Sequence, residues 1–148
     1  MAVVVDVSLE ALPPEVAVRG LAALLQRAGE APFRDAGHSD ATLSVTVLDD
    51  ADMAALNGQY LDREGPTDVI AFALHDEGEA PVGDVYVGGE QAARQAKVYD
   101  VPPEQELVRL VVHGALHVLG HDHPAGPERD SSAMWTLQER LVREVVDG

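Results

Sequence analysis

The sequence predicts an α+β fold in which about five helices lie on one side of a small mixed sheet of four strands. Two observations predict this class. The chain has 148 residues, of which 46% are hydrophobic and 24% are charged, and this composition is typical of a single domain with one core. Segments with strand character come early, and the strongest helical patterns come late. The expected order is β-α-β-α-β-β-α-α-α.

Four short segments have the apolar content or the alternation of strands. Residues 42–48 show the clearest pattern, because Leu43, Val45 and Val47 alternate with polar neighbours. An acidic loop is expected to join the last two segments. The expected strands are 3–7, 42–48, 69–73 and 82–87.

Helix start and stop signals divide the first half of the chain. Pro13 and Pro14 are expected to begin the first helix, and Gly29 is expected to end it. Asp49 or Asp50 is expected to cap a second helix between the second and third strands.

Three further helices are expected in the second half. The glycines at 88–89 begin one helix, and the prolines at 102–103 begin a strongly apolar one that stops at Gly120. Asp130 or Ser131 is expected to cap the last helix, which has an amphipathic pattern.

Charge and composition exclude several classes of function. The chain has 26 Asp and Glu against 10 Lys and Arg, a net charge of −16, and this acidity disfavours polyanionic partners at long range. It has no cysteine, which excludes disulfides, thiolate nucleophiles and cysteine zinc sites. No apolar run is long enough for a membrane span, and the N-terminus lacks the features of a signal peptide. We expect a soluble cytoplasmic protein without a membrane partner.

Histidines are the residues that indicate chemistry. Four of the six lie within residues 113–123. His113 and His117 are spaced to project from one face of a helix, where two imidazoles can share a metal ion. A reversal at Gly120 allows His123 to return as a third ligand. Three imidazoles leave one position of a tetrahedral ion open, as in catalytic zinc sites, so we expect one Zn²⁺ per chain, although nickel or copper would also bind.

Simpler interpretations compete with the metal site. A single histidine in an apolar helix is more often a hydrogen-bonded core residue, but the joint spacing with Gly120 favours a metal. His121 is expected to point away from the ion, and His38 and His75 are expected to be solvated loop residues. Asp122 either orients one imidazole as a hydrogen-bond acceptor or is a turn carboxylate.

The histidine spacing is also that of the metzincin zinc peptidases. Those enzymes require a Glu directly after the first His as their general base, and this chain has Gly114 there. A metal-dependent hydrolase of the peptidase class therefore remains a disfavoured alternative.

The block from His113 to His123 resembles the signature of the YbeY family, bacterial rRNA maturation factors regarded as metal-dependent endoribonucleases. Further blocks stand in the family's order upstream and extend the resemblance over about residues 45–125. These are Leu56-Asn57-x-x-Tyr60, Pro66-Thr67-Asp68-Val69-Ile70-x-Phe72, Gly83-Asp84-Val85 and a helix rich in Gln and Ala at 91–95.

The resemblance implies a zincin-like hydrolase domain over residues 1–148, with zinc on His113, His117 and His123. It implies cleavage of single-stranded RNA in rRNA processing, ribosome maturation and quality control. Metal-bound water or the RNA's 2′-OH would attack the phosphate. The implied partners are rRNA, small-subunit ribosomal proteins or a ribosome-associated GTPase.

Two departures from the family pattern affect the expected catalytic loop. The family usually has Arg directly after Tyr60, whereas this chain has Leu61, and the usual Ser before Phe72 is Ala71. Arg63 is the candidate to replace the missing Arg, and with Asp122 it completes the expected catalytic residues. The departure at Leu61 keeps open a third interpretation, a ribosome-associated binding factor whose metal is structural. The cations expected to face phosphate are Arg63, Arg94, Lys97 and Arg109.

Overall fold

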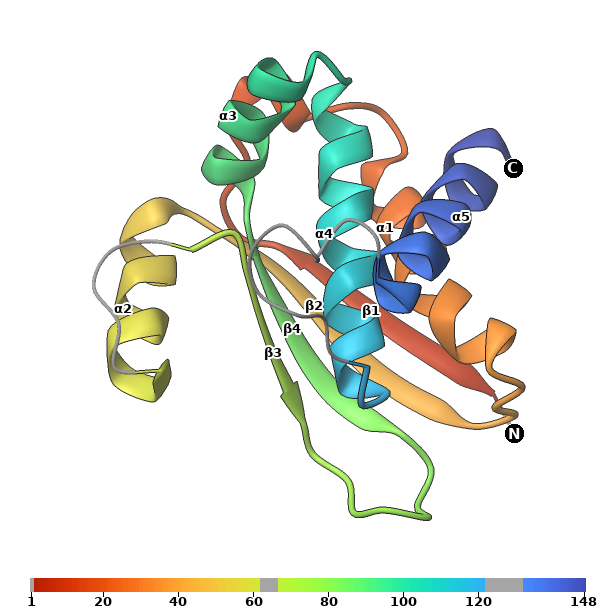
Figure 1. The fold of residues 1–148 in the computed structure, drawn as a ribbon. Helices are drawn as coiled ribbons and strands as arrows, with labels where there is room; N and C mark the ends of the chain where they lie inside the picture. The colour runs from red at the N-terminus through yellow and green to blue at the C-terminus, as the bar shows by residue number, and fades with distance from the viewer. Residues whose placement is uncertain (1, 62–66, 122–131) are drawn as a thin grey trace.

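Four strands form one mixed sheet (Figure 1). The computed structural model describes residues 2–61, 67–121 and 132–148. The sheet order is β1-β2-β4-β3, in which β1, β2 and β4 are parallel and the edge strand β3 is antiparallel to β4. The strands are β1 (Val3–Leu9), β2 (Ala41–Leu48), β3 (Val69–Ala73) and β4 (Val82–Gly88). The predicted four-stranded mixed sheet is confirmed.

Five α-helices lie in the described part of the chain, in the predicted order. They are α1 (Leu21–Asp35), α2 (Asp50–Leu61), α3 (Gly89–Tyr99), α4 (Pro103–Val118) and α5 (Ala133–Asp147), and a short 3₁₀ turn, η1 (Pro14–Val16), precedes α1. α4 crosses β3 and β4, α1 packs on β1, and α5 packs on α4 and α1 (Figure 1). None of the described helices is long and apolar enough to cross a membrane.

The sheet buries one face under these helices. In β2, Leu43, Val45 and Val47 are at most 1% exposed and join the core with residues of α1, α4 and α5. The alternate residues face away from this core, and among them Ser44 Oγ donates a hydrogen bond of 2.6 Å to Asp84 Oδ1 of β4. The predicted alternation in this strand is therefore a real division between an apolar face and a polar face.

The first helix differs from the prediction at both ends. Pro14 begins only the turn η1, and α1 starts after Gly20, whose φ is +77°. Gly29 does not end the helix, which continues through Pro32 to Asp35. A Cβ at Gly29 would lie 2.9 Å from Val5 Cγ1 of β1, so this glycine allows α1 to pack closely on the sheet. The sequence signal for a helix end was wrong because the glycine serves a tertiary contact.

Of two other predicted helix caps, one is confirmed and one is wrong. Asp49 Oδ1 accepts a hydrogen bond from the Asp52 N–H at 2.9 Å and caps α2. The cap of α5 is Ser132, whose Oγ accepts from the Trp135 N–H at 3.1 Å. The predicted cap, Asp130 or Ser131, was therefore wrong in position, and both of those residues lie outside the described ones.

Candidate metal centre

Two glycines bring α4 unusually close to the sheet. A Cβ at Gly114 would lie 2.6 Å from Val85 Cγ1 of β4, and a Cβ at Gly83 of β4 would lie 2.6 Å from Val118 Cγ1 of α4. Real side chains do not tolerate such distances, so each glycine allows the approach at its own end of the contact. This packing fixes the position of α4, the helix that carries His113 and His117.

His113 and His117 face each other along α4. Their Nε2 atoms are 3.0 Å apart, and their ring centroids are 4.6 Å apart with an interplanar angle of 73°. Tetrahedral zinc with nitrogen bonds of about 2.0–2.1 Å places two ligand nitrogens about 3.3 Å apart. The two rings therefore share one face of the helix, as the spacing predicted, and their separation is close to the one that two ligands of one ion require.

The chain reverses directly after the second histidine. The Gly120 N–H donates to the His117 carbonyl at 2.9 Å and the His121 N–H to the Leu116 carbonyl at 3.0 Å, with Gly120 at φ +96°. This is the Schellman arrangement that a C-terminal glycine favours. The predicted stop of α4 at Gly120 thus turns the chain beside His117.

The third predicted ligand, His123, lies outside the described residues, as do the candidate catalytic residues Arg63 and Asp122. Within residues 2–61, 67–121 and 132–148, no group of three or more His, Asp or Glu is placed to hold a metal ion. The structure brings two predicted ligands together, and zinc on His113, His117 and His123 stays a prediction.

A polar chain starts at His113 and joins α4 to α5. His113 is 7% exposed, and its Nδ1 lies 2.6 Å from Gln138 Oε1. Gln138 Nε2 donates to Glu139 Oε2 at 3.0 Å. Glu139 accepts two hydrogen bonds of 2.9 Å from Arg109, whose Nη1 also donates to Glu106 Oε1 at 3.2 Å. We call these five residues the α4–α5 polar chain.

Burial and pairing shift the pKa values of this chain in opposite directions. Burial raises the pKa of Glu106, and the nearby Arg109 only partly opposes that rise. Burial also acts to raise the pKa of Glu139, but hydrogen bonds from Arg109 and Gln138 outweigh it and hold that pKa below its usual value. The hydrogen bond to Glu139 raises the pKa of Arg109. Glu139 and Arg109 therefore form a stable ion pair behind the histidine.

A polar cavity of about 620 Å³ opens beside His113. The polar chain forms one wall of it. The other lining side chains come from the start of β3, from α3 and from α5, and include Asp68, Gln95, Tyr99 and Trp135. His113 thus borders a hollow whose volume lies within the range of about 300–1,000 Å³ that is typical of small-molecule sites.

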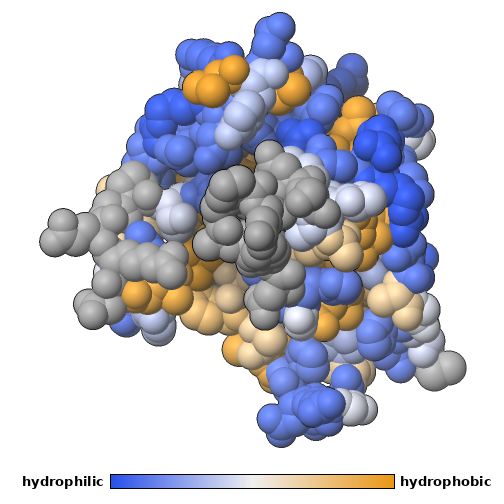
Figure 2. Space-filling model, viewed as in Figure 1, coloured by the Kyte–Doolittle hydropathy of each residue, from blue (hydrophilic) through white to orange (hydrophobic). Residues whose placement is uncertain are grey.

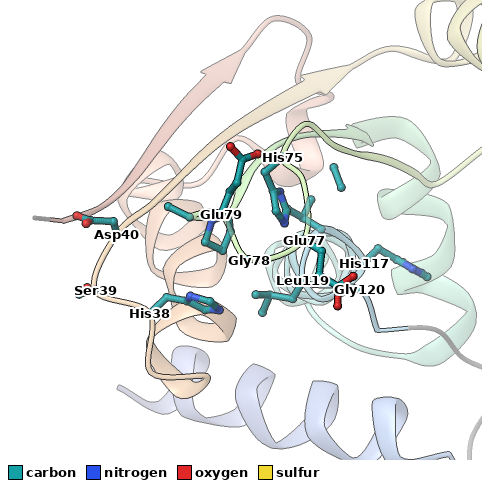
Figure 3. A pocket seen from close by; sticks show the side chains of 14 residues that line it. His38, Ser39, Asp40, His75, Glu77, Gly78, Glu79, His117, Leu119 and Gly120 are labelled. Atoms are coloured by element: carbon teal, nitrogen blue, oxygen red, sulfur yellow. The ribbon is translucent and has the colours of Figure 1, made fainter.

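A second cavity, of about 690 Å³, lies on the other side of the α4 terminus (Figure 3). His38, His75 and His117 all line it, but the ring of His117 points away from the other two. His75 Nδ1 accepts a hydrogen bond from the Val82 N–H at 3.1 Å, and His38 is exposed. His38 and His75 therefore do not join the candidate metal centre.

Two of the cations expected to face phosphate are paired with carboxylates. Arg94 lies 2.9 Å from Asp50 of α2, and Arg109 is held by the polar chain. Lys97 lies on α3 and is exposed. Carboxylates therefore compensate two of the three predicted cations that the structure describes, and the fourth, Arg63, lies outside the described residues.

Gln138 and Glu139 were missed at the sequence level. Each lies on an amphipathic helix, where Gln and Glu are typical of the solvated face. Gln138 is only 1% exposed because α5 packs against α4 and α1. No local sequence signal reports that contact.

Comparisons with known proteins cover nearly the whole chain. Residues 14–146 match the family model described as Endoribonuclease YbeY. The relative of that name from Syntrophotalea carbinolica is 38% identical over 126 residues, which cover 82% of this chain and 84% of the relative. The one from Micrococcus luteus is 41% identical over 132 residues, or 84% and 83%. The solution structure of TM1509 from Thermotoga maritima superposes with a TM-score of 0.65 at 26% identity, covering 97% of this chain and 90% of that one.

Proposed function

Because this chain belongs to the endoribonuclease YbeY family, we propose that it is a zinc-dependent endoribonuclease for single-stranded RNA. We assign it to rRNA processing, ribosome maturation and quality control in the cytoplasm. Small-subunit ribosomal proteins or a ribosome-associated GTPase are the partners that would direct it to its substrate. The observation that carries the proposal is the His113–His117 pair, whose Nε2 atoms lie 3.0 Å apart on one helix.

The residues of α4 supply the fixed part of the proposed site. His113 and His117 would hold zinc through Nε2, with His123 as the third ligand. Bound zinc would polarise a phosphate oxygen of the RNA and acidify a nearby water. The attacking oxygen would come from water or from the RNA's own 2′-OH. Arg63 and Asp122 remain the candidates for positioning the phosphate and one imidazole.

Cleavage of peptides is the less favoured alternative. A peptidase of the metzincin type needs a Glu at the position of Gly114. A Cβ there would already lie 2.6 Å from Val85 Cγ1 and 3.3 Å from Val69 Cγ2. The position is filled by helix–sheet packing and faces the core, so this fold has no room for that base. We expect no cleavage of denatured casein by the purified protein.

Cleavage of a labelled single-stranded RNA tests the proposed function. The assay compares the purified protein with and without chelator, and with a His117→Ala variant prepared identically. We expect cleavage that requires both the metal and His117, because removing one imidazole from a three-ligand site weakens metal binding sharply. His75→Ala is the matched control, since His75 lies outside the candidate centre, and it should cleave at the wild-type rate.

Three outcomes would contradict the proposal in different ways. Cleavage that persists undiminished in His117→Ala would identify a contaminating ribonuclease. Full zinc content in that variant would show that the ion binds elsewhere. Absence of cleavage in a preparation with one zinc per chain would favour a binding factor whose metal is structural.

A further inference from the structure

In the α4–α5 polar chain, the chemistry of each side chain determines which group donates each hydrogen bond and which group accepts it. We propose that Gln138 is a positioning residue for the metal centre: it holds His113 as the tautomer with hydrogen on Nδ1 and so keeps Nε2 free of hydrogen for the ion. Glu139 and Arg109 set the orientation of the Gln138 amide. This inference rests on the proposed function, because it concerns how that site is prepared.

Arg109 fixes the first donor in the polar chain. A guanidinium has only donors, and it binds Glu139 through two hydrogen bonds of 2.9 Å, so the Glu139 carboxylate is an ionised acceptor. Glu139 Oε2 also lies 3.0 Å from the Gln138 side chain. Only the amide NH₂ can face that oxygen, so the amide orientation of Gln138 is fixed by chemistry.

The orientation of the Gln138 amide determines the tautomer of His113. With its NH₂ on Glu139, Gln138 presents Oε1 to His113 Nδ1 at 2.6 Å. A carbonyl oxygen can only accept, so Nδ1 must carry hydrogen. A neutral imidazole has one N–H, and Nε2 of His113 is therefore the nitrogen with the lone pair. That atom is the one 3.0 Å from His117 Nε2.

Burial makes this arrangement difficult to replace. Gln138 is 1% exposed and His113 is 7% exposed, so water does not readily substitute for either partner. Losing the acceptor would leave a buried N–H unsatisfied and would free the ring to rotate or to change tautomer. Partners of this kind orient metal-ligating histidines, and their loss typically lowers metal affinity by about 10–100-fold.

Three variants of α5 separate the links of the polar chain. Gln138→Met keeps the length of the side chain and removes the acceptor. Glu139→Gln leaves Gln138 in place but removes the carboxylate that fixes its amide. Arg140→Gln is the matched control, because Arg140 is the next residue on the helix and pairs outward with Asp35 and Glu144.

The primary measurement is the ring ¹⁵N spectrum of His113 in the zinc-free protein. We expect the wild type and Arg140→Gln to show hydrogen on Nδ1, and Gln138→Met to lose that tautomer. Glu139→Gln should give a mixture of the two His113 tautomers, because the Gln138 amide in that variant can rotate by about 180° and present either its oxygen or its NH₂ to the ring. Zinc affinity, measured by competition with a chromophoric chelator, should fall by about 10–100-fold in Gln138→Met, less in Glu139→Gln and not in Arg140→Gln.

Hydrogen on Nε2 of His113 in the wild type would overturn the inference, and so would Gln138→Met with unchanged tautomer and affinity. If Gln138→Met fails to fold by circular dichroism, Glu139→Gln decides, since a wild-type spectrum in that variant contradicts the orienting role of Glu139. If the wild type binds no zinc, the proposed function fails, and the tautomer spectra still decide the arrangement of the polar chain.

Discussion

Glu106 is a buried carboxyl group at the inner end of the polar chain. It is 1% exposed, and its Oε1 accepts from Arg109 while its Oε2 is buried without a hydrogen-bond partner among the described residues. Burial raises the pKa of Glu106 above its ordinary value. The folded protein therefore binds a proton at this group more tightly than the unfolded chain does.

This difference predicts how a Glu106→Gln variant depends on pH. Between the unfolded pKa and the raised folded pKa, the free energy of unfolding of the wild type falls as the pH rises, because the folded state binds more protons there. Gln does not titrate, so the stability of the variant relative to the wild type should increase with pH across this window and become constant above it. Urea unfolding at a series of pH values measures the difference, and a constant or falling difference would contradict the raised pKa.

At the scale of elements, local patterns predicted what depends on neighbours in sequence. The alternation of β2, the proline start of α4 and the glycine turn at Gly120 all act within a few residues, and the structure confirms them. Gly29 was misread because its reason is a contact with Val5 of β1. Gln138 was missed for the same reason, since the packing of α5 on α4 buries it. Sequence patterns show the face of an element but not which element will cover it.

The close packing of α4 on β4 gives a prediction of its own. In Gly114→Ala the added methyl would meet Val85 Cγ1 at 2.6 Å, so α4 must shift or Val85 must move. Overpacking of this kind costs about 1–3 kcal/mol, and the better helix propensity of Ala offsets about 1 kcal/mol. We expect a net loss of up to about 2 kcal/mol in the free energy of unfolding in urea.

A double-mutant cycle with Val85→Ala identifies the cause. Removing the Val85 methyl groups leaves a space that the methyl added by Gly114→Ala can enter. The double variant should therefore lose less stability than the two single variants together, by about 0.5 kcal/mol or more. Additive losses would show that the glycine is required for some reason other than this contact.

For the molecule as a whole, the net charge of −16 opposes the approach of RNA, which is also negatively charged. Hydrophilic residues cover most of the visible face, and apolar residues appear between them in smaller separate patches (Figure 2). Many arginines in the described part of the chain are paired with carboxylates, namely Arg34, Arg94, Arg109 and Arg140. A protein of this kind does not attract RNA at long range, and its affinity must come from a few contacts in the site.

This charge distribution predicts a weak and shallow salt dependence of RNA binding. Each phosphate neutralised on a single strand contributes about −0.7 to the slope of log K against log salt concentration. Because the net charge is −16 and four arginines of the described residues are paired with carboxylates, we expect about three phosphate contacts or fewer. The slope should then be no steeper than about −2. Fluorescence anisotropy of a labelled single-stranded RNA, titrated with the His117→Ala variant to prevent cleavage, measures this slope over a range of KCl concentrations.

A slope near −6 would correspond to about eight neutralised phosphates and would contradict the expectation. Such a slope would require a cluster of uncompensated cations away from the paired arginines of α3, α4 and α5. A surface other than the histidine site would then hold the RNA.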